Sequence, residues 1–563
     1  MVDVNYIKKK NTELFRTLEK KDYLNISNTQ NYIPIYNSFF SLNEGNFNCI
    51  NLNHKWHLSN IIDKESTSLY LCKLKNCFNQ KTKEKRVFFK MAPLLDPFKY
   101  LVGKYIIDDK LFNLPNLDNK DISEKIKNMN NSAYVDGLFA YFNNILYSEY
   151  KVLNALEYYG SFLAIKEGFK LDVYDDLDYL QDSDFFKKQE NNLYTIDNYN
   201  HLFAKPEKLK PIKISNDSLK STLSYESIEK LDFDNLFTDN EDKGKGNSNL
   251  IKEELEEYCD SNLILKTSIS LKSTSTCSSR SSHTSVSSGS SSYDSEYNSD
   301  ETSGSESDDE VLYATIKRFP IQLIALENCE KTLDHLILEE EIEDKELIAL
   351  LMQIIMTLII FQKTFSFTHN DLHTNNIMFI KTDKKFLYYK FNNITYKIPT
   401  FGKIFKIIDF GRAIYKFKGK TFCSDSFKPG EDAATQYNTE PFFNDQKARL
   451  EPNFSFDLCR LGCSIYDYII EESDDINNVS ALSPLKQLIV EWCLDDNGMN
   501  LLYKASGADR YPDFKLYKMI ARNVHNHTPQ KQLSRKIFKQ FEFQIINSVS
   551  DLINIDDLPS FIN

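Results

Sequence analysis

Two short segments, each next to apolar runs, constrain the fold of this chain more than any other feature of its sequence. The first runs from His369 to Asn376 and reads HNDLHTNN, and the second runs from Ile407 to Gly411 and reads IIDFG. A helical apolar pattern at 344–364 precedes the first segment, and an apolar strand pattern at 377–380 follows it. Another apolar strand pattern, 403–408, leads into the second segment. The order predicts a buried helix, a polar loop, and two strands that carry polar residues at their ends.

The spacing His-x-Asp-x-x-x-x-Asn and the triplet Asp-Phe-Gly resemble the catalytic loop and the metal-binding loop of protein kinases. A third segment, 452–466, resembles the central helix of the large kinase lobe, with Asp457 at the start of an Asp-x-x-x-Leu-Gly pattern. On these segments the chain is identified as a divergent member of the protein kinase superfamily. The sequences of several of its segments are also similar to those of the kinase-like proteins of large cytoplasmic DNA viruses. The resemblance covers about residues 65–175 and 311–525.

The resemblance implies an α+β, bilobal fold with a small β-rich N-lobe and a larger helical C-lobe. Between 268 and 310 the chain is Ser-rich and then acidic, a composition that buries too little apolar surface to order itself. We therefore expect a long, mostly disordered insertion from about 205 inside the N-lobe. The expected organisation is an N-terminal extension at 1–64, the N-lobe at 65–175, the insertion at 176–310, the end of the N-lobe at 311–326, the C-lobe at 327–525 and a C-terminal tail at 526–563.

The residues at 68–75 and 85–91 form a hairpin pattern around a polar stretch, and the second arm carries Lys90 directly after an apolar triplet. By resemblance, Lys90 would hold the nucleotide phosphates and Asp371 would be the catalytic base. Asn376 and Asp409 would bind Mg²⁺, and Asp457 would brace the catalytic loop from beneath. The strand at 319–329 resembles the kinase hinge, where Glu327 and Cys329 would contact the adenine of ATP.

A helical pattern at 133–156 supplies the acid that would pair with Lys90. Glu149 lies on the apolar stripe of that helix and is the first candidate. Asp136, nearer the start of the helix, is the rival because an acid there also suits the helix dipole.

Four departures from the kinase pattern qualify the resemblance. No Gly-x-Gly-x-x-Gly loop precedes Lys90, and no Ala-Pro-Glu ends the segment after Asp409. The position that is Lys in most Ser/Thr kinases is His373, which can neutralise phosphate charge only when protonated. The interval from Asn376 to Asp409 is long, and its β-rich excursion at 386–398 predicts an extruded hairpin.

Composition restricts the partners and the compartment. The net charge of -13 argues against a general nucleic-acid-binding protein, which needs a basic footprint. The ten cysteines show no metal-ligand spacing, and Cys459 and Cys463 suit buried thiols, which fits a reducing, cytoplasmic compartment. The start of the chain lacks the apolar core of a signal peptide. The most apolar stretch, 347–361, is too short to span a bilayer, so no membrane partner is expected.

The first functional hypothesis is an ATP- and Mg²⁺-dependent protein kinase that transfers the γ-phosphoryl group to a protein hydroxyl, with serine or threonine expected as the acceptor. The second is a catalytically weak or inactive pseudokinase scaffold, suggested by the two missing motifs. The third is a small-molecule kinase, suggested by His373 after Asp371 and Leu372.

Overall fold

The computed structural model describes residues 4–118, 120–197, 312–340, 342–471, 478–512, 514–544 and 551–563. The chain divides into two compact units, of which the smaller, Asn200–Thr276, lies outside these residues. The predicted disordered stretch from about 205 to 310 therefore falls outside the described residues, and the account below concerns the larger unit.

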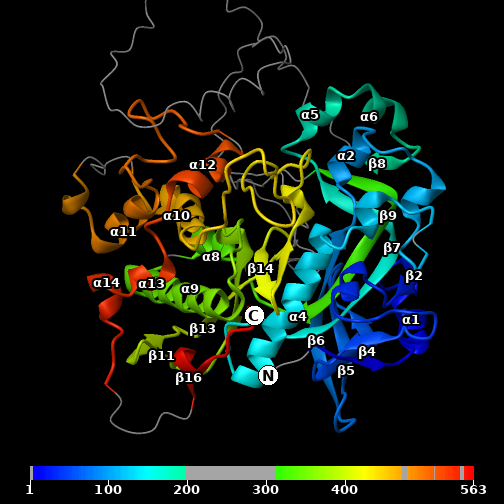
Figure 1. The fold of residues 1–563 in the computed structure, drawn as a ribbon, viewed down its shortest axis with the longest axis horizontal. Helices are drawn as coiled ribbons and strands as arrows, with labels where there is room; N and C mark the ends of the chain where they lie inside the picture. Colours follow the sequence, from blue (N-terminus) through cyan, green and yellow to red (C-terminus); the bar gives the residue numbers. More distant parts are fainter. Residues whose placement is uncertain are drawn as a thin grey trace, which may run out of the picture. The chain divides into compact units, whose positions relative to one another are not determined.

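A curled, mostly buried sheet organises the first part of the fold (Figure 1). Among the described residues it has seven strands in the order β2-β7-β9-β6-β5-β4, with β8 paired to the outer part of β9. All neighbours are antiparallel, and the predicted hairpin is confirmed as β5 and β6. The strands are β2 (Ile26–Gln30), β4 (Trp56–Lys64), β5 (Leu69–Asn76), β6 (Thr82–Pro93), β7 (Tyr158–Asp172), β8 (Tyr194–Ile196) and β9 (Tyr313–Glu327).

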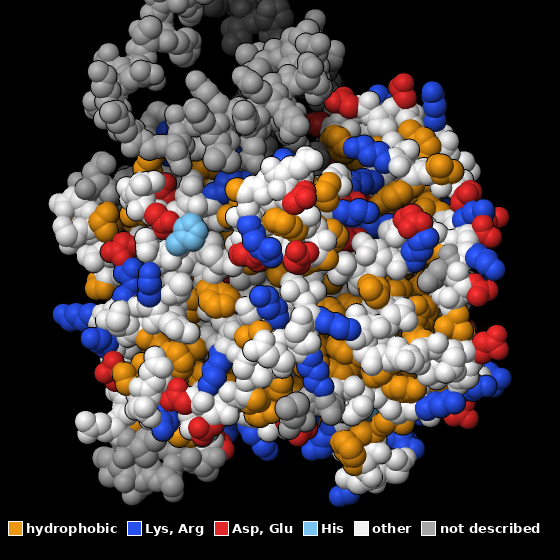
Figure 2. Space-filling view, viewed as in Figure 1, with side chains coloured by type: hydrophobic (Ala, Val, Ile, Leu, Met, Phe, Trp, Pro, Cys, Tyr) orange, Lys and Arg blue, Asp and Glu red, His pale blue; other side chains and the backbone are white. Residues whose placement is uncertain are grey.

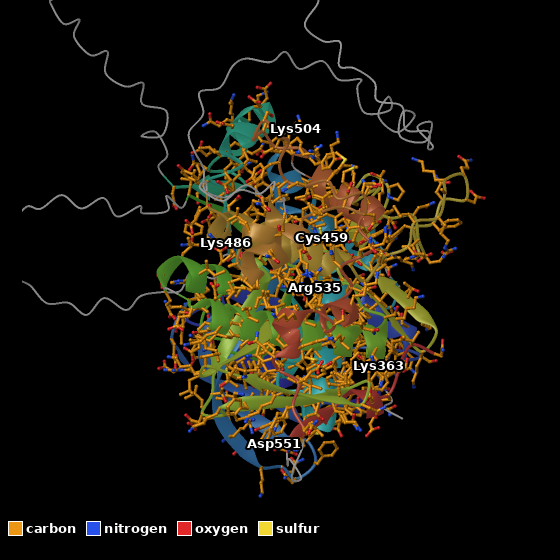
Figure 3. The ribbon with its side chains drawn as sticks, turned by 90° about the vertical axis from the view of Figure 1, so that its left-hand side faces the viewer. Lys363, Cys459, Lys486, Lys504, Arg535 and Asp551 are labelled. Atoms are coloured by element: carbon orange, nitrogen blue, oxygen red, sulfur yellow. The ribbon has the colours of Figure 1, made fainter. Side chains whose placement is uncertain are left out.

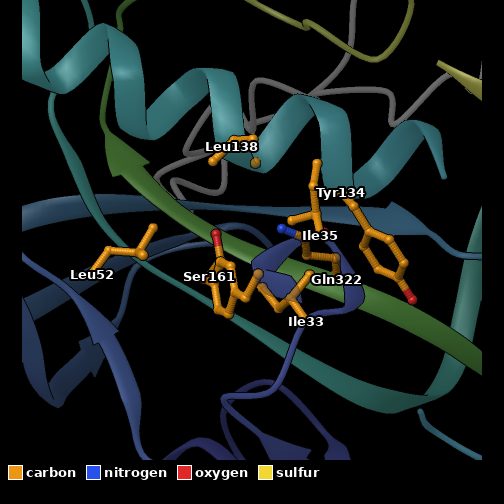
Figure 4. A pocket seen from close by; sticks show the side chains of 9 residues that line it. Ile33, Ile35, Leu52, Tyr134, Leu138, Ser161 and Gln322 are labelled. Atoms are coloured by element: carbon orange, nitrogen blue, oxygen red, sulfur yellow. The ribbon is translucent and has the colours of Figure 1, made fainter. Parts of the chain in front are cut away.

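Helix α4 (Ser132–Tyr150) packs against β7 and β9 of this sheet. The Asn131 side chain caps it by accepting a hydrogen bond from the Ala133 amide, and Lys151 ends it in a left-handed conformation. The helix therefore stops six residues before the predicted end at 156. Gly137 allows the close approach, because a Cβ there would lie 2.1 Å from the Gln322 amide nitrogen on β9. Figure 4 shows this tight interface, where a small gap between α4 and the sheet is lined by Ser161 and Gln322.

The second part of the fold is built around α9 (Asp344–Phe365), where the sequence predicted a helix. This helix has 22 residues and is long and apolar enough to cross a membrane. The apolar stretch at 347–361 is shorter and did not predict this. In the structure, 89% of the most apolar window of the helix is buried inside the protein. Strands β10 (Ile377–Lys381) and β13 (Lys403–Ile407) pair antiparallel beside it, and β11 (Phe386–Phe391) and β12 (Ile394–Pro399) form the predicted hairpin between them.

Of the remaining elements of this part, helix α8 (Leu333–Glu339) precedes α9, and the others follow Asp409. The short hairpin β14 and β15 comes first, and the helices come next. They are β14 (Ile414–Phe417), β15 (Lys420–Cys423), α10 (Phe456–Ile469), α11 (Pro484–Trp492), α12 (Lys515–Asn523), α13 (Pro529–Gln532) and α14 (Lys536–Lys539). Cys459 and Cys463 lie on α10 and are buried, as the sequence predicted (Figure 3).

Both ends of the chain are integrated into the fold. β4 and β2, from the expected N-terminal extension, form the two outer strands of the main sheet, so 1–64 is not a separate appendage. At the other end, β16 (Leu552–Asn554) pairs with β11, and Lys363 of α9 donates hydrogen bonds to the carbonyls of Ile555 and Asp556 at 2.5 and 2.7 Å (Figure 3). The other elements before α4 and inside the expected insertion are β1 (Tyr6–Lys8), α1 (Thr12–Leu18), β3 (Ile50–Leu52), α2 (Pro97–Leu101), α3 (Glu124–Lys127), α5 (Leu177–Gln181) and α6 (Asp184–Gln189).

Charged side chains of both signs lie on the face of the molecule seen in Figure 2. Figure 2 shows that Lys and Arg side chains are interspersed with acidic ones on the face in view, without a continuous basic stripe.

Candidate active site

Three charged side chains from three distant segments meet beside the main sheet. The Lys90 ammonium, on β6, lies 2.6 Å from Asp136 Oδ2 of α4 and 2.9 Å from Asp409 Oδ1, which follows β13. The Lys90 side chain is 12% exposed, whereas that of Asp409 is 33% exposed. The cluster is therefore closed toward the helix and open at Asp409.

The charges in this cluster are mutually dependent. Desolvation raises the pKa of Asp136, and the nearby Asp409 raises it further against the opposing effect of Lys90. Desolvation would also raise the pKa of Asp409, but the Lys90 ammonium outweighs it and lowers that pKa. Burial works against the charge on Lys90, yet the two carboxylates raise its pKa above the ordinary value. The Lys90 ammonium therefore favours the charged form of Asp409, whereas burial and Asp409 oppose the charged form of Asp136.

Phe410 fixes the direction of Asp409. Its ring is buried against Phe139 of α4, with ring centroids 4.7 Å apart, and its amide donates to Asp136 Oδ1 at 2.9 Å. Asp409 has a backbone φ of +60°, a conformation that costs energy for a residue other than glycine. Packing of the next residue against α4 therefore holds the Asp409 carboxylate toward Lys90.

The loop from His369 to Asn376 places three polar side chains together. Asn376 Nδ2 donates to the Asp371 carbonyl at 2.8 Å and lies 3.1 Å from His373 Nε2. Because an amide nitrogen is a donor, His373 Nε2 is the acceptor of this contact. Burial lowers the pKa of His373 to about 4, with Asp371 opposing that effect. His373 is therefore neutral at pH 7 and positions Asn376.

Asp457, at the start of α10, holds this loop from beneath. Its Oδ2 accepts from the His369 amide at 2.9 Å, and its Oδ1 accepts from the Asn370 amide at 2.9 Å. Asp457 is fully buried, and Asn370 has a φ of +63°. The predicted contact between Asp457 and the backbone of the loop is confirmed.

The carboxylate of Asp371 is enclosed rather than open. Tyr517 of α12 donates its hydroxyl proton to Asp371 Oδ1 at 2.7 Å, and Arg412 Nε lies 3.9 Å from Asp371 Oδ2. The residue is only 4% exposed. Burial alone would raise its pKa, but Arg412, with smaller contributions from other neighbours, lowers it to about 2.

The segment after Asp409 is fixed to the helices by ion pairs. Asp425 pairs with Lys125 of α3 at 2.8 Å and also accepts from the Ser132 amide at the start of α4 at 3.1 Å. Glu431 pairs with Lys99 of α2 at 2.5 Å, and Arg412 pairs with Asp432 at 2.6 Å. These contacts order the segment although it lacks the Ala-Pro-Glu sequence.

The predicted adenine-contacting residues lie at the end of β9. The Glu327 carboxylate forms an ion pair with Lys406 of β13, which is fully buried, and accepts from the Glu157 amide at 2.9 Å. Burial and the charge of Glu327 raise the pKa of the partly buried Cys329 thiol to about 12. The Glu327 side chain is thus committed to a structural pair, and its backbone amide donates to the Glu157 carbonyl at 3.0 Å.

The structure corrects one predicted pairing. Glu149 is exposed near the end of α4 and does not meet Lys90, whose helix partner is the rival candidate, Asp136. Tyr517 and Arg412 were missed by the sequence reasoning. Arg412 directly follows Asp-Phe-Gly and could have been flagged by position, but Tyr517 lies 146 residues after Asp371 with no motif around it.

The oxygen groups near Asp409 suit Mg²⁺, which is usually bound by few protein ligands together with waters and phosphates. Asp409 Oδ1 faces Lys90, and the Asp409 side chain remains partly exposed. Asn376 uses its amide nitrogen for the loop contacts, so its Oδ1 is the atom that would bind a metal. Among the described residues, no group of three or more His, Cys, Asp or Glu side chains forms an all-protein metal site.

Comparison with known proteins gives a distant relative. No protein-family model matches the chain. Over 245 residues the chain is 24% identical to "Uncharacterized protein 098R" of Invertebrate iridescent virus 6. The match covers 41% of this chain and 37% of that protein, so the chain spans little more than a third of the relative's length. The chain is therefore similar, over part of its length, to a viral protein.

Proposed function

We propose that the protein is an ATP- and Mg²⁺-dependent protein kinase with a divergent bilobal kinase fold, acting on serine or threonine hydroxyls. The observation that carries the proposal is the bridging of Asp136 and Asp409 by Lys90. In protein kinases a strand Lys pairs with a helix acid while the Asp of Asp-Phe-Gly holds the metal, and both must be in place for activity.

Further support comes from the arrangement of the elements. The Lys strand β6, the acid-bearing helix α4 and the strands β7 and β9 follow one another along the chain, and Asp409 comes from the separate β10–β13 pair. Asp457 holds the backbone of the loop that contains Asp371. Sequence motifs and geometry are thus consistent in segments that are far apart in the chain.

The proposal assigns a task to each residue. Lys90 neutralises phosphate charge, Asp409 and Asn376 hold Mg²⁺, and Asp371 orients the acceptor hydroxyl and receives its proton. Mg²⁺, when bound, offsets the charge on the phosphates. With its pKa near 2, Asp371 is a weak base, and its main contribution is orientation.

The nucleotide side differs from the usual kinase pattern. The turn between β4 and β5 stands where a Gly-rich loop is expected and contains Glu65, Ser66, Thr67 and Ser68. Ser66 Oγ accepts from the amides of Ser68 and Leu69, which closes the turn without glycine. We expect weaker phosphate binding than in kinases whose loop backbone cradles the phosphates.

A second candidate function is a nucleotide-binding scaffold without efficient transfer. The enclosure of Asp371 by Tyr517 and Arg412 favours it, because an acceptor hydroxyl has no open route to the carboxylate in this conformation. Nothing in the described site favours the small-molecule kinase over these two.

The test is transfer from labelled ATP by the purified full chain, with and without Mg²⁺ and with mixed protein acceptors. The kinase proposal expects Mg²⁺-dependent label on protein that is lost in Asp371→Asn. Mg²⁺-ATP binding without transfer would establish the scaffold, and absence of binding would rule out both.

A further inference from the structure

The two carboxylates of the site differ in access. The Asp409 side chain is a third exposed, whereas Asp371 is enclosed by Arg412, which follows Asp-Phe-Gly, and by Tyr517 of α12. The Tyr517 hydroxyl lies 2.7 Å from Asp371 Oδ1, which is the distance of a strong hydrogen bond to an ionised oxygen. In the proposed reaction, the acceptor hydroxyl requires a contact of this kind with the same carboxylate.

The orientation of the Tyr517 hydroxyl is fixed by a second contact. Arg460 Nε, on α10, donates to the Tyr517 oxygen at 2.9 Å. Because Arg460 can only donate, the tyrosine proton is directed to Asp371. Tyr517 is 1% exposed, so this contact is shielded from water.

Neighbouring groups hold Tyr517 in place. Its ring stacks on Phe514 with centroids 5.0 Å apart, and the Arg412 guanidinium lies over both rings at 5.3 and 5.8 Å. At the far end of α12, Arg522 donates to the Thr435 carbonyl at 2.6 Å, which ties the helix to the segment after Asp409. Helix α12 therefore contacts both Asp371 and the segment that would form the acceptor side of the site.

We propose that Tyr517 is the acceptor-side specificity residue of the site, whose hydroxyl occupies the position on Asp371 that a substrate hydroxyl must take. The inference rests on the proposed kinase function. An acceptor binds by displacing Tyr517 from Asp371, and the region around Arg412 then receives the segment that carries the hydroxyl. Arg412 Nη1 is buried without a hydrogen-bond partner among the described residues, so an acidic group next to the acceptor hydroxyl would satisfy it. The preferred acceptor is therefore a hydroxyl in an acidic peptide.

The experiment compares Tyr517→Phe with the wild type on a Ser-containing acidic peptide, a basic peptide of equal length, and Mg²⁺-ATP. Tyr194→Phe is the matched control, because Tyr194 is equally buried and its hydroxyl donates to the Phe186 carbonyl at 2.7 Å in a distant part of the sheet. We expect the KM of Tyr517→Phe for the acidic peptide to fall about five- to tenfold, because loss of one charge-assisted hydrogen bond weakens the internal competitor. The kcat and the affinity for Mg²⁺-ATP should not change.

Three results would overturn the inference. One is a fall in kcat at unchanged KM, which would make Tyr517 a residue that positions Asp371. Another is kinetics identical to those of Tyr194→Phe, and the third is phosphate on Tyr517 itself in the wild type, detected by peptide mass mapping. Failure of the proposed function has a different signature, since wild type and control would then both fail to transfer phosphate to any peptide. In that case hydrogen exchange still tests the contact with Asp371. If the α12 amides exchange at the same rate in Tyr517→Phe and in the wild type, the Tyr517 hydroxyl does not hold this helix in place.

Discussion

The cluster around Asp409 and the cluster around Asp371 each hold an aspartate, but they differ in how far its carboxylate is exposed. Around Asp409 an ion pair from β6 and α4 leaves a carboxylate partly exposed. Around Asp371 a tyrosine hydroxyl and an arginine enclose the other carboxylate, which is almost fully buried. The first cluster leaves its carboxylate partly accessible to solvent, and the second holds its carboxylate in a buried hydrogen bond to Tyr517.

The difference teaches that a complete motif set does not fix the accessibility of its members. Local sequence places Asp371 and Asp409 on their loops, but the exposure of each depends on which distant segment packs over it. In this protein, α12 covers one of them. The predictions below separate the two clusters, beginning with the largest expected effect.

If the proposed function holds, Asp409→Ala should reduce Mg²⁺-dependent transfer to background and remove the stabilisation of the protein by Mg²⁺-ATP, because the proposed main metal ligand would be lost. Asp371→Asn should also lose transfer but keep the ligand-induced rise in Tm. Thermal melts with and without Mg²⁺-ATP measure the contrast. Equal ligand shifts in Asp409→Ala and the wild type would contradict the assignment of the open cluster.

Asp457→Ala should destabilise the fold itself. The His369 and Asn370 amides would lose their acceptor inside the protein, at about 1–3 kcal/mol each. Urea unfolding gives the free energy, and Asp457→Asn, which keeps one acceptor oxygen, is the milder comparison. A wild-type midpoint in Asp457→Ala would show that the loop is held in another way.

His373 should make stability depend on pH. Its pKa of about 4 in the folded protein is below the unfolded value near 6.5, so between these values the unfolded chain binds a proton that the folded chain does not. Stability is therefore lost as the pH falls through this window, by at most about 3 kcal/mol from this group. His373→Gln should reduce the difference in unfolding free energy between pH 7 and pH 4.5. His57, whose pKa burial also lowers to about 4, would still contribute the same trend in both proteins.

Asp136→Asn should weaken Mg²⁺-ATP binding and transfer by about 10- to 100-fold, because Lys90 loses the charged partner that positions it. Glu149→Gln, on the same helix, is the matched control and should behave as the wild type. Titration of each variant with Mg²⁺-ATP gives the dissociation constants that show which acid is the partner of Lys90. The reverse ranking would restore Glu149 as the partner of Lys90.

Removal of 205–310, with a short Gly/Ser linker in its place, should have the smallest effect. The Asp197 amide donates to the Tyr313 carbonyl at 3.0 Å, so the chain on either side of the removed stretch starts from adjacent points on β8 and β9. Shortening a loop by half changes the closure free energy by only about 0.6 kcal/mol. A cooperative melt within a few degrees of the wild type is expected, and an insoluble or non-cooperative product would contradict it.

The sequence by itself determined the local elements that carry the site. The hairpin that carries Lys90, the helix before His369 and the two strands that flank the excursion follow from short-range pattern and spacing. The contact of Asp457 with the loop followed from the resemblance of its helix to that of kinases. Such signals are local because periodicity and turn residues fix secondary structure within a few residues.

Only the tertiary structure decided which partners meet. Helix α4 is buried on nearly all sides up to Leu146, so its apolar stripe did not reveal the face toward Lys90. Gly137 sets that face through close contact with Gln322, and Asp136 lies next to it, about 20 Å along the helix from Glu149. The outer strands from the first 64 residues and the hydroxyl of Tyr517 on Asp371 likewise depend on contacts between remote segments. These contacts depend on how all the elements pack together, and no single segment of the sequence encodes them.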